Sequence, residues 1–390
     1  MYSTILIKFS IIRGGLFYRL QERLNLVHEN DSRTVARAFI FALVTWLPLF
    51  ILAALQNLAL TGDSRQSLLL DFPVYGRFLI AVPLFIIAEN VIDDRYVIIT
   101  SYFLNSGIVP EAERSRYVDV LSSMRRLVFS PTAEIIILLA AYLVSTLSVS
   151  HKLIYAAATS WCETETGHLS LAGWWFLLVS LPLFHFLLIR WFWRLIVWCL
   201  FLRRLARLDL QLVSTHPDAV GGLGVLGESI FAFTPIAFAL SALLSATWYR
   251  KVVYEGGTAT QFHRPFLVFL FITILIAFAP LLNFTGRLMR LKLHGLHDYG
   301  VLANTHSLQF DEKWVRKGEK NIDQLLGTPD ISSLADLGAG FQTVRNMKFF
   351  PFGLQNLLML AAAAAIPMIP LVLVEIPLRE LVLKLAGALF

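Results

Sequence analysis

Residues 172–202 read AGWWFLLVSLPLFHFLLIRWFWRLIVWCLFL, an apolar stretch whose only charged side chains are Arg190 and Arg194. A membrane-spanning helix needs about 20 mostly apolar residues, so this stretch is longer than one span requires. Six further apolar stretches lie at residues 38–60, 78–92, 132–150, 230–248, 266–283 and 354–375. We therefore predict an all-α polytopic membrane bundle of about seven transmembrane helices. The second stretch is short enough that a re-entrant segment is the alternative.

The composition supports a membrane protein and excludes an ordinary soluble one. The 390 residues are 57% hydrophobic and 15% charged, with a mean hydropathy of +0.66. Soluble domains contain about a quarter charged residues. The net charge of +6 does not indicate nucleic-acid binding, because the basic residues flank the apolar stretches, where anionic lipid headgroups account for them.

The basic residues are distributed unevenly between the two sides of the predicted bundle. Segments 1–37, 93–131, 203–229 and 284–353 together contain 23 Lys and Arg, whereas segments 61–77, 151–171, 249–265 and 377–390 contain 8. Because basic loops stay in the cytoplasm, we predict a cytoplasmic N-terminus and an outer C-terminus in a cell (inner) membrane. The two cysteines, Cys162 and Cys199, then lie on opposite sides, and we expect no disulfide between them.

The chain divides into four predicted regions with different tasks. Residues 1–37 form an N-terminal cytoplasmic segment, of which 4–26 read as an amphipathic helix on the inner face. Residues 38–283 contain six spans, and their loop 111–127 has the spacing of an amphipathic helix, on the membrane face or packed on protein. Residues 284–353 form a cytoplasmic helical segment with a helix that begins at Pro329, and 354–390 contain the seventh span and an outer tail.

Four charged residues fall at similar depth near the inner ends of three spans: Glu89, Glu134, Arg190 and Arg194. Charges inside spans mark solute pathways by default. One interpretation is therefore a polar inner mouth for ions or small solutes, and the other is structural ion pairing between helices. For the two arginines alone, side chains that extend to the inner headgroups are expected. Prolines in six of the spans are a weaker sign of a pathway.

A second polar group, His216, Asp218, His294 and His297, lies in the predicted cytoplasmic segments. His294 and His297 have the i, i+3 spacing of a metal pair, but we favour interfacial or partner-facing histidines and predict no metal. Gly222, Gly224 and Gly227 match G-x-G-x-x-G without the strand that a dinucleotide site needs, so we predict a tight turn. Nucleophile, Walker and zinc-protease motifs are absent, so we predict no cofactor, and a membrane enzyme is the least favoured of three functions.

Two segments resemble a family of uncharacterised multi-pass bacterial inner-membrane proteins. They are residues 216–224, HPDAVGGLG, and residues 326–338, LGTPDISSLADLG, the latter followed by Phe341, Val344, Arg345, Met347, Pro351 and Phe352. The resemblance covers about residues 190–380. It implies a membrane location and no particular activity.

These features lead to two functional hypotheses. The first is an oligomeric channel or transporter for ions or small solutes, since an N-in, C-out layout of seven helices is similar to the insect odorant-receptor type of ion channel. The alternative is a non-conducting membrane sensor or scaffold that binds a cytoplasmic partner through its inner helices. We expect the bilayer and other copies of the chain as partners, and no nucleic acid.

Overall fold

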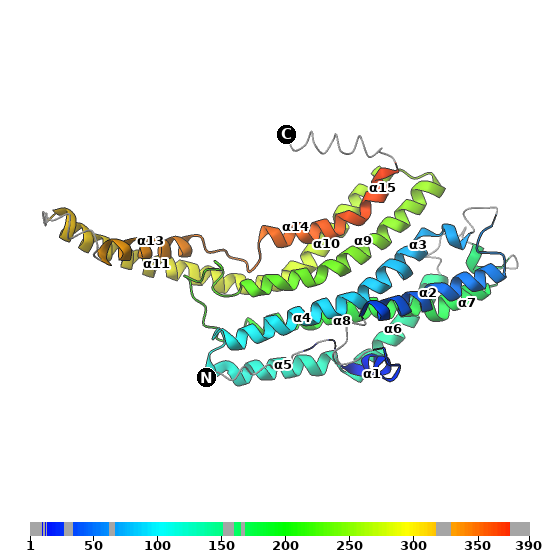
Figure 1. The fold of residues 1–390 in the computed structure, drawn as a ribbon, viewed down its shortest axis with the longest axis horizontal. Helices are drawn as coiled ribbons and strands as arrows, with labels where there is room; N and C mark the ends of the chain where they lie inside the picture. The colour runs from blue at the N-terminus through cyan, green and yellow to red at the C-terminus, as the bar shows by residue number, and fades with distance from the viewer. Residues whose placement is uncertain are drawn as a thin grey trace.

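A computed structural model describes residues 10, 12, 14–26, 34–61, 67–150, 160–164, 168–316 and 329–374. These residues form helices and turns with no strand, and seven helical stretches are long and apolar enough to cross a membrane. Figure 1 shows the long helices running side by side along the longest axis of the molecule. The all-α prediction with seven spans is therefore confirmed. The predicted N-terminal residues 1–9 and the outer tail 375–390 lie outside the described residues.

The first four spans form one half of the bundle. The first is α2 (Thr34–Leu55), and the third is α6 (Pro131–Ser150), which follows η3 (Glu111–Glu113) and α5 (Arg114–Val128). The second runs continuously through α3 (Phe72–Tyr75), the π-helical η2 (Gly76–Ala81) and α4 (Val82–Asn105). The fourth runs through α7 (Leu171–Trp175), the π-helical η5 (Phe176–Ser180) and α8 (Leu181–Leu205). Short 3-10 turns, η1 (Leu68–Leu70) and η4 (Ser160–Cys162), lie near the ends.

The last three spans form the other half, which packs on the first through α4 and α9. The fifth is η6 (Gly224–Gly227) with α9 (Glu228–Glu255). The sixth is a 58-residue helix made of η7 (Ala259–Phe262), α10 (His263–Phe278), η8 (Ala279–Phe284), α11 (Thr285–Phe310) and η9 (Asp311–Arg316). The seventh contains α14 (Leu354–Ala365), η10 (Ile366–Met368) and α15 (Ile369–Leu373).

The sixth helix continues far past the bundle, and α13 (Pro329–Arg345) packs against α11 there. We call the pair α11 and α13 the arm; it projects from one end of the molecule in Figure 1. The predicted helix after Pro329 is confirmed. Of its predicted face, Val344 is fully buried and Leu334, Leu337 and Phe341 are half-buried, whereas Ile331 is exposed.

The second span is much longer than the sequence predicted. Its helix covers 34 residues, Phe72–Asn105, without turning back, so the re-entrant alternative is wrong. The apolar stretch was bounded by Arg77 and Asp93, yet both side chains are buried among neighbouring helices. The polar ends of this span are therefore covered by protein instead of marking the ends of the helix.

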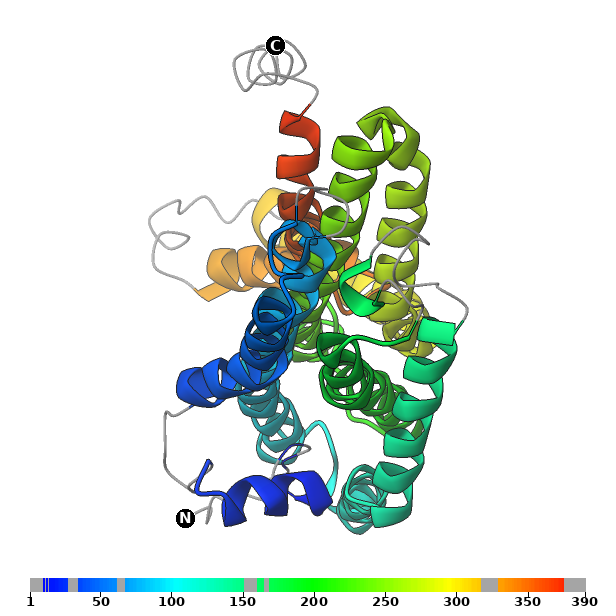
Figure 2. The same cartoon turned by 90° about the vertical axis from the view of Figure 1, so that its right-hand side faces the viewer.

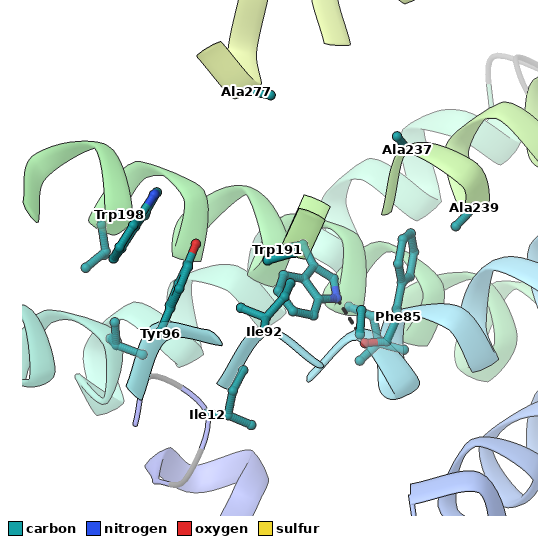
Figure 3. Packing of buried hydrophobic residues seen from close by; sticks show 14 of the residues in the cluster. Ile12, Phe85, Ile92, Tyr96, Trp191, Trp198, Ala237, Ala239 and Ala277 are labelled. Atoms are coloured by element: carbon teal, nitrogen blue, oxygen red, sulfur yellow. Dashed lines mark hydrogen bonds between the residues drawn. The ribbon is translucent and has the colours of Figure 1, made fainter. Parts of the chain in front are cut away.

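The fourth helix also continues beyond the predicted membrane, and protein covers its apolar end. The ring of Trp198 stacks on Tyr96 of α4 at 4.0 Å, and Phe201 contacts Tyr117 of α5. Figure 3 shows Trp191 and Trp198 of α8 facing Phe85, Ile92 and Tyr96 of α4. The predicted amphipathic helix near 111–127 is α5, and its buried residues Tyr117, Leu121 and Met124 lie on the side that packs on α8. Of the two alternatives, packing on protein is the observed one.

Helix α1 (Gly15–Arg23) lies across the direction of the spans, as Figure 2 shows. It packs against the start of α6. We call the end of the bundle that carries α1, α5 and the arm the α1 end, and the opposite end the far end. Cys162 in η4 and Cys199 in α8 lie toward the far end and the α1 end respectively, and both are free thiols.

Candidate functional site

Glu89 of α4 is the centre of a buried charge cluster at the α1 end. Its Oε1 accepts hydrogen bonds from Arg190 Nη1 at 2.9 Å and Arg194 Nη1 at 3.1 Å. Its Oε2 accepts one from Arg37 Nη2 of α2 at 2.9 Å. None of the four residues is more than 6% exposed. One carboxylate therefore joins three helices that are far apart in the sequence.

The positions of these residues along their helices explain why they meet. Arg190 and Arg194 are four residues apart, so both point from the same face of α8. Glu89 and Asp93 have the same spacing on α4, and Asp93 is also buried and accepts a hydrogen bond from Ser10 Oγ at 2.7 Å. The two helices thus present a pair of guanidinium groups to a pair of carboxylates.

Aromatic rings complete the surroundings of the arginines. The Arg190 guanidinium lies 4.8 Å from the ring centre of Phe17 on α1, and that of Arg194 lies 4.7 Å from the ring centre of Trp191. Such cation–π contacts stabilise a desolvated guanidinium group by up to about 2 kcal/mol. Trp191 is itself held by a hydrogen bond from Nε1 to the Phe85 carbonyl at 3.1 Å, which is drawn in Figure 3.

Positive charge exceeds negative charge among the described side chains of the cluster. Arg37, Arg190 and Arg194 face Glu89 and Asp93. In addition, Arg194 Nη2 and Arg37 Nε are fully buried and have no hydrogen-bond partner among the described residues. Leaving a buried charged donor unpaired costs a few kcal/mol, so these two groups are the most costly polar atoms of the cluster.

The cluster lies at the level of the α1 end where the membrane is expected to stop. At about 1.5 Å per residue, Glu89 is roughly 26 Å along the helix from Phe72, close to the thickness of a ~30 Å hydrocarbon core. Helix α1 crosses the bundle at the same level, since Phe17 contacts Arg190. The sequence-based expectation that Arg190 and Arg194 extend to lipid headgroups is wrong, because Glu89 holds both inside the bundle.

Glu134 has a different role from the other three predicted charges. Its Oε2 accepts hydrogen bonds from the backbone N–H groups of Leu16 and of Phe17, the latter at 3.1 Å. Gly15 has a φ of +87°, and a Cβ atom there would lie within 2.2 Å of Glu134 Oε1. Glu134 therefore fixes the start of α1, where a helix N-terminus favours a negative charge.

The residues around Gly15 form a strap that closes the α1 end of the bundle. We use strap for the described residues 10, 12 and 14–17. Ser10 bonds to Asp93, Ile12 is 3% exposed within the core, and Phe17 packs on Phe186 with ring centres 5.0 Å apart. The strap thus covers the charge cluster from the α1 side.

The structure brings together only half of the predicted histidine group. His216 Nδ1 lies 2.8 Å from Asp218 Oδ1, but His294 and His297 are exposed on α11. Among the described residues, no set of three or more His, Cys, Asp or Glu side chains is arranged to hold a metal.

Asp218 holds the loop around Gly222 and Gly224 in shape, the loop for which the sequence predicted a tight turn. Its carboxylate accepts hydrogen bonds from the backbone N–H groups of Val220, Gly222 and Gly224, at 2.8 to 3.1 Å. Burial opposes the charged form, but these bonds and His216 outweigh it and hold the pKa of the Asp218 carboxyl below its usual value. No strand precedes the glycines, so the loop is a turn of the backbone and lacks the surroundings of a dinucleotide site.

The loop of the first resemblance segment lies beside the residues that follow α13. The backbone N–H of Lys348 donates to the Ala219 carbonyl at 2.7 Å, and Asn356 Nδ2 donates to the Gly227 carbonyl at 3.2 Å. Gly221, with a φ of +68°, lies against Leu291 of α11 and Met347. The Asp218 loop therefore fastens the base of the arm to the bundle.

Sequence reasoning missed Arg37 and Asp93, as well as a second buried polar group at the far end. There, Trp161 Nε1 donates to Asp71 Oδ2 at 2.8 Å, and Arg250 lies 3.6 Å from Asp71 Oδ1. Burial raises the pKa of the Asp71 carboxyl above its usual value, although Arg250, Trp161 and Arg77 counteract it. Arg37, Asp93, Asp71 and Arg250 each lie near an apolar stretch in the sequence. The signal that could have predicted these pairs is that residues of opposite charge stand at the same ends of different spans.

Replacing Glu89 by Gln is expected to destabilise the protein by about 3–5 kcal/mol, because three buried guanidinium groups lose their shared carboxylate. The control is Glu228→Gln, which removes a pair with Arg95 in which both side chains are more than 40% exposed and which contributes less than about 1 kcal/mol. Unfolding in detergent followed by tryptophan fluorescence measures both. Equal effects of the two variants would show that the cluster does not stabilise the fold.

Replacing Asp218 by Asn is expected to lower stability at neutral pH by about 2 kcal/mol, through the loss of charge-assisted hydrogen bonds. Because the folded-state pKa is lowered, this contribution is present above the unfolded pKa of about 4 and is lost as the pH falls through the folded value. Unfolding free energies of both proteins between pH 7 and pH 3 should therefore converge toward acid. A constant difference across that range would contradict a charged Asp218.

No family model matches the chain, and neither a curated protein nor a solved structure matches it. Membership in the family of uncharacterised inner-membrane proteins stays a prediction from the two quoted segments.

Proposed function

We propose that the protein is an oligomeric membrane conduit, a channel or transporter, and that the cluster of Arg37, Glu89, Arg190 and Arg194 forms its inner mouth. The observation that carries this proposal is the excess of buried positive charge among the described residues, which leave two guanidinium N–H groups without a partner. A negatively charged solute would complete the hydrogen bonding of both groups. Small anions are therefore the favoured solutes.

Structural ion pairing alone accounts less well for the composition of the cluster. Ion pairs that only hold helices together need one cation for each carboxylate. Every additional buried charge near the membrane is costly. The third arginine is retained although Glu89 already has two partners on α8. An additional charge that does not improve pairing supports a role in recognising solute.

The covering strap implies that the described conformation is closed. Ser10, Ile12 and Phe17 lie over the cluster, and a pocket of about 240 Å³ on another face of α8, between α8, α9, α10 and α14, is almost entirely apolar. Opening therefore requires the strap to move. The excess of Lys and Arg in the loops at the α1 end supports a cytoplasmic position for this end, in an inner membrane.

Purified protein in planar bilayers with a KCl gradient tests the proposal. Gly15→Ala is expected to raise conductance several-fold over the wild type, because its Cβ atom collides with Glu134 and loosens the strap. Gly338→Ala on the arm, where a Cβ atom meets nothing within 4 Å, should leave conductance unchanged. In the open variant, Arg190→Gln should reduce chloride over potassium selectivity, and Arg345→Gln, at an exposed position on the arm, should not.

The absence of any current from wild-type and Gly15→Ala protein of native helix content would contradict the conduit. Arg190→Lys keeps the charge while removing the planar guanidinium group, so it separates the loss of charge from a loss of folding. Cation selectivity in the open variant would contradict the assignment of the cluster.

A second candidate function, a scaffold that binds other copies of the chain through the arm, is favoured by a separate observation. One face of the sixth helix is apolar and exposed far beyond the bilayer, at Met289, Leu293, Val301, Leu308 and Val315. Counted from Ala259, Met289 is already about 45 Å along the helix, past a ~30 Å core. Lipid does not cover these residues, and α13 lies on another face.

Cysteine cross-linking in membranes tests association through the arm. Leu308→Cys on the apolar face is expected to give disulfide-linked dimers, whereas Gln309→Cys, exposed about 100° farther around α11, should give fewer. The native Cys162 and Cys199 are replaced by Ser in both variants. Equal yields from the two positions would contradict a defined interface.

A further inference from the structure

A cleft of about 390 Å³ lies between α1, α6 and α8 at the α1 end of the bundle. Its walls include Leu16 and Leu20 of α1, Leu138 and Tyr142 of α6, and Pro182 and Leu183 of α8. It is open toward the surface that faces lipid, because Leu16, Leu20 and Leu138 are between 43% and 53% exposed. The cleft is separate from the charge cluster, which is fully buried on the other side of Phe17.

The polar side chains in the walls of the cleft, Glu134 and Tyr142, already have hydrogen-bond partners within the protein. Glu134 is part of the lining, but its carboxylate already accepts the backbone N–H groups at the start of α1. The hydroxyl of Tyr142 donates to the Leu178 carbonyl at 3.1 Å. A hydrocarbon chain therefore fits the cleft better than a polar solute does.

Exposed arginines lie at the end of the cleft where the bilayer stops. Arg19 and Arg23 are exposed on α1, the helix that lines the cleft with Leu16 and Leu20. Arg125 and Arg126 are exposed in the last turn of α5, just before α6 begins. Glu22 is the one acidic residue of α1, so basic side chains outnumber it on these two segments.

The end of α5 and the start of α1 are also in direct contact. The Arg125 guanidinium lies 5.9 Å from the ring centre of Phe129, and a Cβ atom at Gly14 would lie 2.9 Å from the same ring. Gly14 immediately precedes α1. Arg125 therefore lies beside the start of α1, and Arg19 and Arg23 follow farther along the helix that lines the cleft.

We propose that the cleft holds one acyl chain of an anionic phospholipid and that the arginines of α1 and α5 bind its phosphate headgroup. Leu16 and Leu20 share the exposed face of α1 with Arg19 and Arg23, so an acyl chain and its headgroup can both contact this interfacial helix. Each basic residue near an anionic membrane surface contributes about 1 kcal/mol to lipid binding. The charge of the arginines selects an anionic headgroup over a zwitterionic one. A lipid whose chain lies in the cleft is retained, whereas the other lipids around the protein exchange.

The bound lipid would contact Phe17, which lines the cleft and also packs over Arg190. Occupancy of the cleft therefore stabilises the closed strap. This inference does not depend on whether the protein conducts, because it concerns only the retention of lipid.

Native mass spectrometry of delipidated protein tests the proposal, with phosphatidylglycerol and phosphatidylcholine of identical chains added separately. The wild type is expected to retain one phosphatidylglycerol at collision energies that remove phosphatidylcholine. Leu138→Trp fills the cleft and should abolish this retention. Leu139→Trp, on the same helix, 65% exposed and outside the lining, is the matched control and should retain the lipid.

The double variant Arg125→Gln with Arg126→Gln tests the headgroup separately. It should reduce the preference for phosphatidylglycerol over phosphatidylcholine by about thirtyfold, since two phosphate contacts worth about fivefold each are lost. Leu183→Trp fills the cleft from α8 and repeats the Leu138→Trp test from another helix. Equal retention of both lipids by the wild type, or undiminished retention by both tryptophan variants that line the cleft, would overturn the proposal.

Discussion

The sharing of one carboxylate among three guanidinium groups determines how this bundle is assembled. Glu89 is the only acceptor that the described residues give to Arg190 and Arg194, and it also binds Arg37. Because a buried charge without a partner is far more costly than a paired one, α2, α4 and α8 cannot slide or rotate independently. The rotation of α8 set by these bonds also turns Trp191 and Trp198 toward α4, where they pack against Phe85 and Tyr96.

The strap and helix α1 depend on the same arrangement. Phe17 lies against Arg190 only because Glu89 holds that arginine at the surface of the cluster. Glu134 of α6 accepts hydrogen bonds from the backbone N–H groups of Leu16 and Phe17 and thereby orients α1 across the bundle. The charge cluster, the strap and the lipid-facing cleft are therefore in contact with one another through Phe17. A structural change in one of them is transmitted to the others through Phe17 and its neighbours.

The sequence predicts what depends on apolar length and periodicity, and misses what depends on pairs from distant parts of the chain. The seven spans, α5 and α13 follow from these local patterns. The length of the fourth helix, 171–205 against a predicted apolar stretch of 172–202, follows as well. The true length of the second helix does not, because Arg77 and Asp93 look like the ends of a span until their partners are known. Glu134 was predicted at the correct end of its helix, yet its partner is the backbone beside Gly15, which no side-chain pattern reveals. The pair Asp71 and Trp161 likewise joins two segments that are 90 residues apart.

The continuity of the sixth helix has a mechanical consequence. From Ala259 to Arg316 it is a single rod of about 87 Å, and the part beyond Phe284 accounts for roughly 48 Å of it. Between its two ends the helical type changes at Ala279–Phe284, around Pro280, where the rod leaves the bundle, and a proline there weakens the backbone against bending. A tilt of about 5° at this point moves the tip of the arm by roughly 4 Å, given the rise of a helix per residue. The arm is thus a lever that converts small rearrangements among the packed spans into displacements as large as a side chain.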